Sequence, residues 1–172
     1  GIGVIQDIVV NHIGSNHWWL KDLPEKGWLN YNASFHPTNH ARTTVQDPYA
    51  ANIDAKAFVD GWFVDSMPDL NQRHPLLATY LIQNSVWWVE FANLSGIRED
   101  TYSYADKDFL TQWSKRLMTE YPQFNIVGEE WSANPVVVSY WQKGKQNSDG
   151  YQSSTPSMMD FPLYYALLAA LT

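Results

Sequence analysis

Short β-branched runs alternate with longer helical patterns along this chain, and this alternation limits the fold more than any other feature. Four runs are typical of strands, and they cover residues 1–10, 94–100, 124–127 and 158–160. Helical patterns follow, and they begin at Asn71, Asp106, Asn134 and Phe161. Strands that alternate with helices predict a parallel sheet. The β-branched residues of the first run predict that this strand is buried.

Several residues mark where the helices begin and which side of each is buried. Pro75 suits a first helical turn, Asp106 suits the position that caps one, and Asn134–Pro135 combines both signals. The residues that we expect on shared helix faces are Leu77, Leu81, Trp88, Phe91, Leu110, Trp113 and Leu117. The helix after Phe161 carries Leu163, Leu167, Leu168 and Leu171.

A long segment without periodicity interrupts the alternation. Residues 13–60 are rich in Asn, His, Trp, Pro and Asp, and they greatly exceed the length of an ordinary connection. We expect a folded excursion with short strands, of which Gly61–Val64 is the last. Its aromatic residues fit either a core or stacking surfaces for a sugar ring, and they include Trp18, Trp19, Trp28 and Tyr31.

Composition argues against several classes of function. The net charge of −7 and the scattered Lys and Arg residues argue against a nucleic-acid partner. No apolar run reaches the length of a membrane span. Cysteine is absent, which excludes disulfides and thiolate chemistry but does not decide the compartment. The sequence also lacks a glycine-rich phosphate loop, a Gly-x-Ser-x-Gly motif and the zinc-binding His-Glu-x-x-His spacing.

Carboxylic acids stand where two of the strand-like runs end. Asp100 closes Gly96–Asp100, and Glu129 follows Ile126–Gly128. Polar residues at the carboxyl ends of successive parallel strands build the active site of an α/β barrel. A pair of carboxylic acids at such a place suits glycoside hydrolysis. A third polar cluster, Asp7–His12, ends the first run, and its histidine is either a catalyst or a structural residue.

The neighbours of these two acids favour different roles for them. Side chains alternate along a strand, so Arg98 and Asp100 point the same way and Glu99 points the other. An arginine beside Asp100 keeps it ionised, as a nucleophile requires, although the same spacing also fits a structural ion pair.

Glu129 and Glu130 compete for the role of a general acid. A neighbouring carboxylate and partial burial favour the protonated form that this role needs. Gly128 allows a close approach of the backbone, and Trp131 offers an apolar wall. The same two glutamates also fit an acidic pair on the surface.

The number of strands limits the architecture further. A closed eight-stranded barrel takes about 250 residues, whereas this chain has 172 residues and about four strand–helix units. We therefore expect part of a barrel, and a complete small α/β sheet is the alternative.

Together these segments resemble the α-amylase family of glycoside hydrolases. Asp7–His12, Gly96–Asp100 and Gly128–Trp131 look like its signature segments at barrel strands three, four and five. Met67–Asn71 looks like an extra segment of the neopullulanase, cyclomaltodextrinase and oligo-1,6-glucosidase neighbourhood. The resemblance implies that residues 1–172 form strands 3 to 6 of a (β/α)8 TIM barrel. It also implies a domain B-like insertion at residues 13–66.

The resemblance implies a role for each matching residue. Asp100 is the nucleophile, and the Gly-Glu-x-Trp pattern selects Glu129 over Glu130 as the acid/base. Arg98 orients and ionises Asp100, and His12 hydrogen-bonds a sugar hydroxyl. The expected substrate-binding and supporting residues are His12, Arg98, Asp7, Asn11 and Trp131.

The resemblance also implies a function, which is retaining hydrolysis of α-1,4 bonds, with or without α-1,6 bonds, in maltodextrin, pullulan or cyclodextrin. The two carboxyl groups would then lie about 5–5.5 Å apart. The same residues suit a glucanotransferase. An amylase-like glucan-binding protein without catalysis and a stand-alone sugar-binding domain also stay open. The expected partner is an α-glucan, with no nucleic acid, and the resemblance slightly favours a periplasmic or secreted protein.

The sequence departs from the family pattern at three places. The family's Asn-His-Asp segment, which carries a third catalytic carboxylate, is absent, so we expect the chain alone to be inactive. Glu99 stands where the family has an apolar residue facing the helices, and a buried charge there needs a partner. Many amylases bind calcium through the asparagine matched by Asn11 and a histidine where this chain has Tyr104. We therefore expect no metal and no cofactor.

Overall fold

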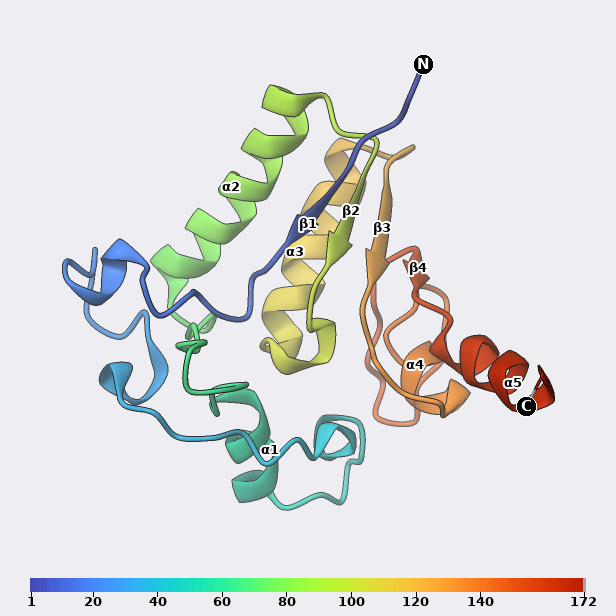
Figure 1. Ribbon diagram of the computed structural model, residues 1–172, viewed down its shortest axis with the longest axis horizontal. Coiled ribbons are helices and arrows are strands. Elements are labelled where there is room, and N and C mark those ends of the chain that lie inside the picture. The colour runs from blue at the N-terminus through green and yellow to red at the C-terminus, as the bar shows by residue number, and fades with distance from the viewer. Residues whose placement is uncertain (172) are drawn as a thin grey trace.

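The computed structural model describes residues 1–171 and contains a parallel sheet of four strands in the order β1–β2–β3–β4 (Figure 1). Thr172, the last residue of the expected domain, lies outside the described residues. The strands are β1 Ile5–Ile8, β2 Gly96–Glu99, β3 Asn125–Gly128 and β4 Ser157–Met158. Each strand pairs in parallel with its successor in the sequence. The predicted α/β fold is confirmed, and the sheet is consistent with part of a (β/α)8 barrel.

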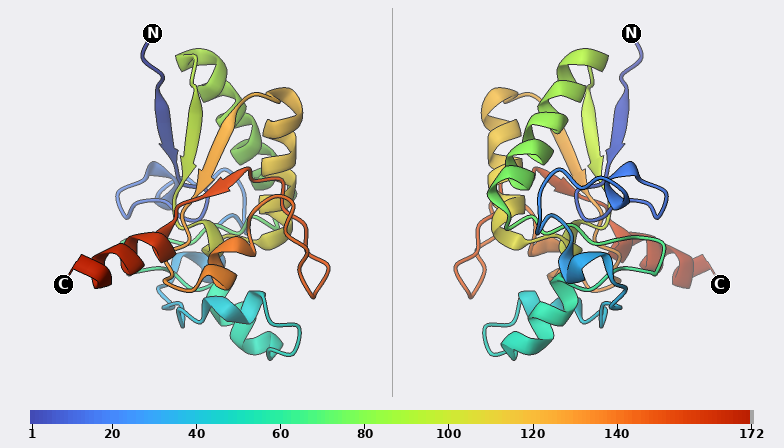
Figure 2. Two further views of the ribbon diagram at one scale, coloured as in Figure 1. Left: turned by 90° about the vertical axis from the view of Figure 1, so that its right-hand side faces the viewer. Right: turned by 90° about the vertical axis from the view of Figure 1, so that its left-hand side faces the viewer.

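Two long helices lie against the same face of this sheet (Figures 1 and 2). They are α2, Pro75–Ala92, and α3, Lys107–Glu120. The other helices are α1 Asn52–Val59, α4 Pro135–Ser139 and α5 Phe161–Leu171. No helix within residues 1–171 combines the length and the apolar character that crossing a bilayer requires.

The helix signals in the sequence explain where these elements begin. Pro75 occupies the first turn of α2, and the Asp106 carboxylate accepts a hydrogen bond from Phe109 N (2.9 Å) at the start of α3. Asn134 caps α4 in the same way, through Val136 N (2.9 Å). These side chains satisfy amide donors that have no partner within the helix.

The core lies between the sheet and the two long helices. The indole Nε1 of the buried Trp113 donates to Ser85 Oγ (2.9 Å), which joins α3 to α2 and satisfies a polar atom inside the core. The predicted core positions that the structure buries are Leu77, Leu81, Leu110, Trp113 and Leu117.

Two predictions about burial need correction. The first strand is buried on one face only: Ile8 and Val10 are buried, whereas Ile5 and Val9, which alternate with them, are exposed on the face that no helix covers. Phe91 is 70% exposed, whereas Val89 is buried. Successive positions four residues apart place Leu81, Ser85 and Val89 on one stripe of α2, and Phe91 falls outside that stripe.

The excursion lies beyond the carboxyl ends of the strands (Figure 1). It contains the short helix α1 and the 3₁₀ turns η1 Trp18–Leu20, η2 Asn30–Ala33 and η3 Arg42–Val45. The predicted short strands are wrong, including Gly61–Val64. Trp62 forms only an isolated bridge with Pro37, which has no N–H to continue a ladder.

The segment Met67–Asn71 joins the excursion to the end of β1. His12 bridges Asp69, and Leu29 bridges Leu70. Asp69 is fully buried, and its Oδ2 accepts a hydrogen bond from Asn30 Nδ2 (2.8 Å). The segment therefore fixes the excursion close to the carboxyl edge of the sheet.

Glu99 is buried on the helix side of the sheet, as its position in the strand predicts. Its Oε1 accepts a hydrogen bond from Val10 N (3.1 Å), which is the partner that the sequence did not identify. Burial raises the pKa of Glu99 well above its ordinary value, and the hydrogen bond from Val10 opposes this effect without cancelling it. Glu99 therefore favours the protonated form in the folded protein.

Replacing Glu99 with Gln is expected to make the folded protein less sensitive to rising pH. Above about pH 4.5 the folded protein binds more protons at Glu99 than the unfolded chain does, so the free energy of unfolding falls as pH rises. Between pH 4.5 and the raised pKa of Glu99, the wild type should lose at most about 1.4 kcal/mol of stability for each pH unit, and Glu99→Gln should not. Urea unfolding between pH 4.5 and 8 measures the difference, with the exposed Glu120→Gln as control. Equal slopes for Glu99→Gln and wild type would contradict the prediction.

Candidate active site

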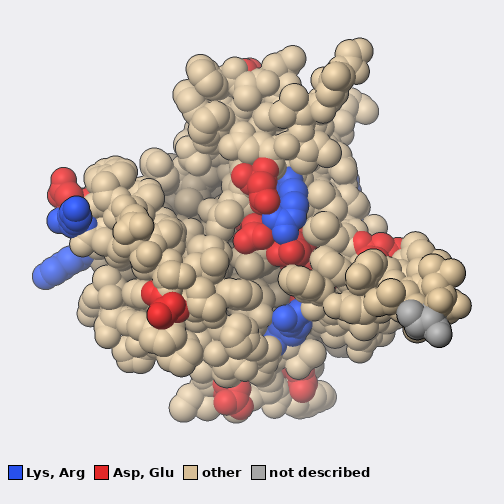
Figure 3. Space-filling view, viewed as in Figure 1, with Lys and Arg blue, Asp and Glu red and all other residues tan. Residues whose placement is uncertain are grey.

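The side chain of Arg98 lies at the centre of three carboxylates. Its Nη1 donates to both oxygens of Asp7 (2.8 Å each) and to Asp100 Oδ1 (2.9 Å). Its Nη2 lies 2.7 Å from Glu129 Oε1. Figure 3 shows this group of acidic and basic side chains on one face of the molecule. The structure thus brings together four of the residues singled out in the sequence.

The register of the sheet explains why these residues meet. Asp7 pairs with Arg98 across β1 and β2, and Glu99 pairs with Gly128 across β2 and β3. Asp100 and Glu129 therefore follow adjacent strands at the same level. The backbone pairing continues past the strands, because Glu129 N donates to the carbonyl oxygen of Glu99 (2.9 Å).

Gly128 permits the close packing beneath Glu129. A Cβ atom added at Gly128 would lie 2.8 Å from the side chains of Met158 and Tyr102. Any larger residue would displace these neighbours and, with them, the turn that carries Glu129. This agrees with the predicted close approach of the backbone at this glycine.

Hydrogen bonds fix the two candidate catalytic acids in different ways. Glu129 is oriented from both sides, since Oε1 contacts Arg98 and Oε2 accepts a hydrogen bond from Thr101 N (3.0 Å). Asp100 contacts Arg98 through Oδ1 and remains partly exposed. Partial burial lowers the pKa of Arg98, but hydrogen bonds to Asp100 and Asp7 and the charge of Glu129 outweigh it, so the net shift is upward.

Glu130 is buried and lies apart from the Arg98 cluster, so Glu129 and Glu130 do not form an acidic pair on the surface. In the Glu130 side chain, Oε1 lies 2.9 Å from Arg42 Nη1 and Oε2 accepts a hydrogen bond from Trp141 Nε1 (3.1 Å). Burial raises the pKa of Glu130, and the charge of Arg42 is among the effects that oppose it. Of the two competing glutamates, the one that faces Arg98 is Glu129.

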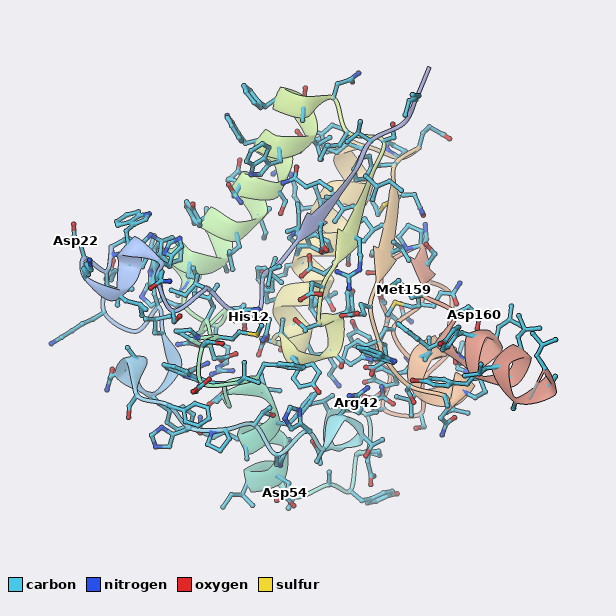
Figure 4. The ribbon with its side chains drawn as sticks, viewed as in Figure 1. His12, Asp22, Arg42, Asp54, Met159 and Asp160 are labelled. Atoms are coloured by element: carbon cyan, nitrogen blue, oxygen red, sulfur yellow. The ribbon has the colours of Figure 1, made fainter. Side chains whose placement is uncertain are left out.

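His12, labelled in Figure 4, and its neighbour Asn11 follow the end of β1, and His12 lies close enough to Asp100 to feel its charge. The ring Nδ1 of His12 lies 3.3 Å from Asn11 Nδ2. Burial lowers the pKa of His12, and the charge of Asp100 opposes this effect without cancelling it. The net shift favours a neutral imidazole. Asn11 is buried, and its carbonyl oxygen accepts a hydrogen bond from Leu70 N (2.9 Å).

Trp131 presents an open aromatic face beside the carboxylates. It is 61% exposed, stacks on Phe161 with ring centres 5.4 Å apart, and donates from Nε1 to the Tyr165 hydroxyl (2.8 Å). A cavity of about 420 Å³ adjoins this stack, lined by Trp131, Phe161, Tyr164 and the labelled Met159 and Asp160 (Figure 4). The sequence indicated Trp131 as an apolar wall but did not indicate Phe161.

The surroundings of Tyr104 do not fit a calcium site. Its hydroxyl lies 3.0 Å from His40 Nδ1 and accepts a hydrogen bond from Arg42 Nη2 (3.2 Å). A guanidinium at this distance disfavours a second cation. Among residues 1–171, no group of three or more His, Cys, Asp or Glu side chains has an arrangement that could hold a metal ion.

The fold and the site together define a parallel α/β domain with carboxylates at the carboxyl edge of its sheet. A model of the alpha-amylase catalytic domain matches residues 1–169. The chain therefore belongs to the alpha-amylase family, and the resemblance of its segments to that family is confirmed.

Named relatives agree with this assignment. The chain is 29% identical over 170 residues to a cyclomaltodextrinase of Geobacillus thermopakistaniensis, covering 98% of this chain and 25% of the relative. It is 30% identical over 148 residues to the intracellular maltogenic amylase of Bacillus subtilis, covering 85% of this chain and 22% of the relative.

Solved structures share the fold. An Anoxybacillus alpha-amylase matches with a TM-score of 0.74 and 27% identity, over 96% of this chain and 31% of that chain. An alpha-amylase of Geobacillus thermoleovorans complexed with acarbose matches with a TM-score of 0.69 and 30% identity, over 96% of this chain and 32% of that chain. The chain thus spans about a quarter to a third of the length of these relatives.

Proposed function

We propose that this chain supplies the nucleophile and the general acid of a retaining α-glucoside hydrolase. The observation that carries the proposal is the shared contact of Asp100 and Glu129 with the two terminal nitrogens of Arg98. Two carboxyl groups that flank one small space at the carboxyl edge of a parallel sheet suit double displacement. Their predicted separation is about 5–5.5 Å.

Each acid has one task in each half of the reaction. Asp100 attacks the anomeric carbon while Glu129 protonates the departing glycosidic oxygen, which breaks the bond and leaves a covalent glycosyl ester on Asp100. Glu129, now ionised, takes a proton from water as the water attacks the same carbon and releases Asp100. Arg98 donates a hydrogen bond to Asp100 Oδ1 (2.9 Å) and orients this carboxylate for the first step.

Other residues of the site would bind the sugar and support its surroundings. A neutral His12 next to Asp100 suits a hydrogen bond to a sugar hydroxyl. Asp7 holds Arg98 from β1, and Asn11 fixes the backbone after that strand. The exposed ring of Trp131 suits stacking against a sugar face.

The names of the relatives indicate the substrate class. The names cyclomaltodextrinase and maltogenic amylase point to starch-like α-glucans, and one structural relative is complexed with acarbose. We therefore propose α-1,4-linked glucans, with or without α-1,6 bonds, as substrates. A glucanotransferase would use the same residues with a sugar in place of water. A glucan-binding protein without catalysis is less favoured, because Asp100 and Glu129 are both present.

The stereochemistry of the product tests this proposal. The experiment uses the protein that carries residues 1–172 within a complete catalytic domain, because we expect these residues alone, without the third carboxylate, to be inactive. Proton NMR during cleavage of maltotetraose should show the α-anomer of the new reducing end first. Initial formation of the β-anomer would contradict the retaining mechanism. Binding of maltotetraose without cleavage would favour the non-catalytic alternative.

A further inference from the structure

The excursion contributes one arginine to the loop that carries Glu129. Arg42 begins η3, and its Nη1 donates to Glu130 Oε1 (2.9 Å) and to the carbonyl oxygen of Trp131. Its Nη2 donates to the Tyr104 hydroxyl (3.2 Å), and its guanidinium carbon lies 5.8 Å from the centre of that ring. One side chain therefore joins the excursion to the segments that follow β2 and β3 (Figure 4).

Arg42 holds one oxygen of Glu130, and Trp141 Nε1 holds the other (3.1 Å). The Glu130 side chain is fully buried, and a buried carboxylate without a cationic partner is strongly disfavoured. Arg42 forms an ion pair with Glu130, and the Arg42 side chain is itself three-quarters buried. Loss of Arg42 would force Glu130 to take up a proton or to move towards solvent.

Any movement of Glu130 passes directly to Glu129, because the two residues share a peptide bond. The Glu129 carboxylate has different partners, which are Arg98 and Thr101. A small cavity of about 50 Å³ adjoins both Glu129 and Glu130, and Arg42, Phe63 and Trp131 also line it. Arg42 thus acts on the loop and leaves the space beside the Glu129 carboxylate open.

We propose that Arg42 is a positioning residue for Glu129, which it holds towards the scissile bond by fixing the Glu130 side chain and the Trp131 carbonyl group. The inference rests on the proposed function, since it assumes that Glu129 is the general acid. It goes beyond that function by making the excursion a part of the catalytic geometry. A displacement of about 1 Å at a catalytic group is enough to lower a rate about 100-fold.

Substrates with different leaving groups separate this role from a structural one. Maltotetraose needs a proton on its departing oxygen, whereas the fluoride of α-maltosyl fluoride departs with little help from an acid. In the protein with a complete catalytic domain, Arg42→Met should lower kcat/KM for maltotetraose about 100-fold. It should lower kcat/KM for maltosyl fluoride less than about threefold, because only acid assistance is impaired.

Two further variants make the comparison decisive. Arg42→Lys keeps the charge but cannot reach three partners at once, so we expect the same selectivity with a smaller loss, and this variant decides the matter if Arg42→Met does not fold. Arg116→Met removes an exposed arginine of α3 and should change neither rate. Equal losses on both substrates, or no loss on either, would overturn the role of Arg42. A wild-type protein that cleaves neither substrate would refute the proposed function instead, and the inference with it.

Discussion

Replacing Asp100 with Asn is expected to lower kcat on maltotetraose by about four orders of magnitude while leaving the fold intact. The amide is nearly isosteric with the carboxylate but does not attack the anomeric carbon, so the covalent route is lost. Steady-state kinetics in the protein with a complete catalytic domain measure the loss, and thermal unfolding confirms that the variant is folded.

Asp7→Asn is the matched control for this prediction. Asp7 also contacts Arg98 Nη1 and carries the same side chain, but it lies on β1 and has no role in bond cleavage. We expect a loss of about tenfold or less, through a weaker hold on Arg98. Similar losses for Asp7→Asn and Asp100→Asn would show that the charge cluster matters as a whole and that Asp100 is not the nucleophile.

Replacing Arg98 with Met is expected to lower kcat/KM about 100- to 1000-fold, the second-largest effect predicted for this chain. Three carboxylates would lose the cation that they share, and their mutual repulsion would favour protonation of one of them or a shift of its side chain. A protonated or displaced Asp100 is a poor nucleophile.

Arg98→Lys separates the charge from the geometry. A lysine ammonium keeps the positive charge but does not reproduce the fork with which Arg98 contacts Asp100 and Glu129 through different nitrogens. We expect activity between those of Arg98→Met and wild type. Full activity of Arg98→Met would mean that the cluster is a structural ion pair, which the sequence alone also allowed.

The centre of the site could be predicted from the sequence because its geometry is local to the strands. Arg98 and Asp100 are two residues apart on one strand, and a parallel register then brings Glu129 from the next strand to the same level. The core positions Trp113 and Leu117 were predictable for a similar reason, since helical periodicity alone places them on one face.

The parts that could not be predicted depend on contacts between distant segments. Arg42 lies 88 residues from its partner Glu130, inside an excursion without periodicity, and no local pattern links the two. Phe161 stacks on Trp131 only because β4 and α5 return to the site. Ile5 is exposed because it lies on the face of β1 that no helix covers, and a continuous β-branched run does not show which face is covered.

The most direct test of this account is to trap the covalent intermediate and find the residue that carries it. A fluorinated α-glucosyl fluoride that reacts quickly in the first step and slowly in the second should accumulate as an ester on the nucleophile. After proteolysis of the protein with a complete catalytic domain, mass spectrometry should locate the added sugar on Asp100. An adduct on another residue, or continued turnover with no adduct on any carboxylate, would contradict the account.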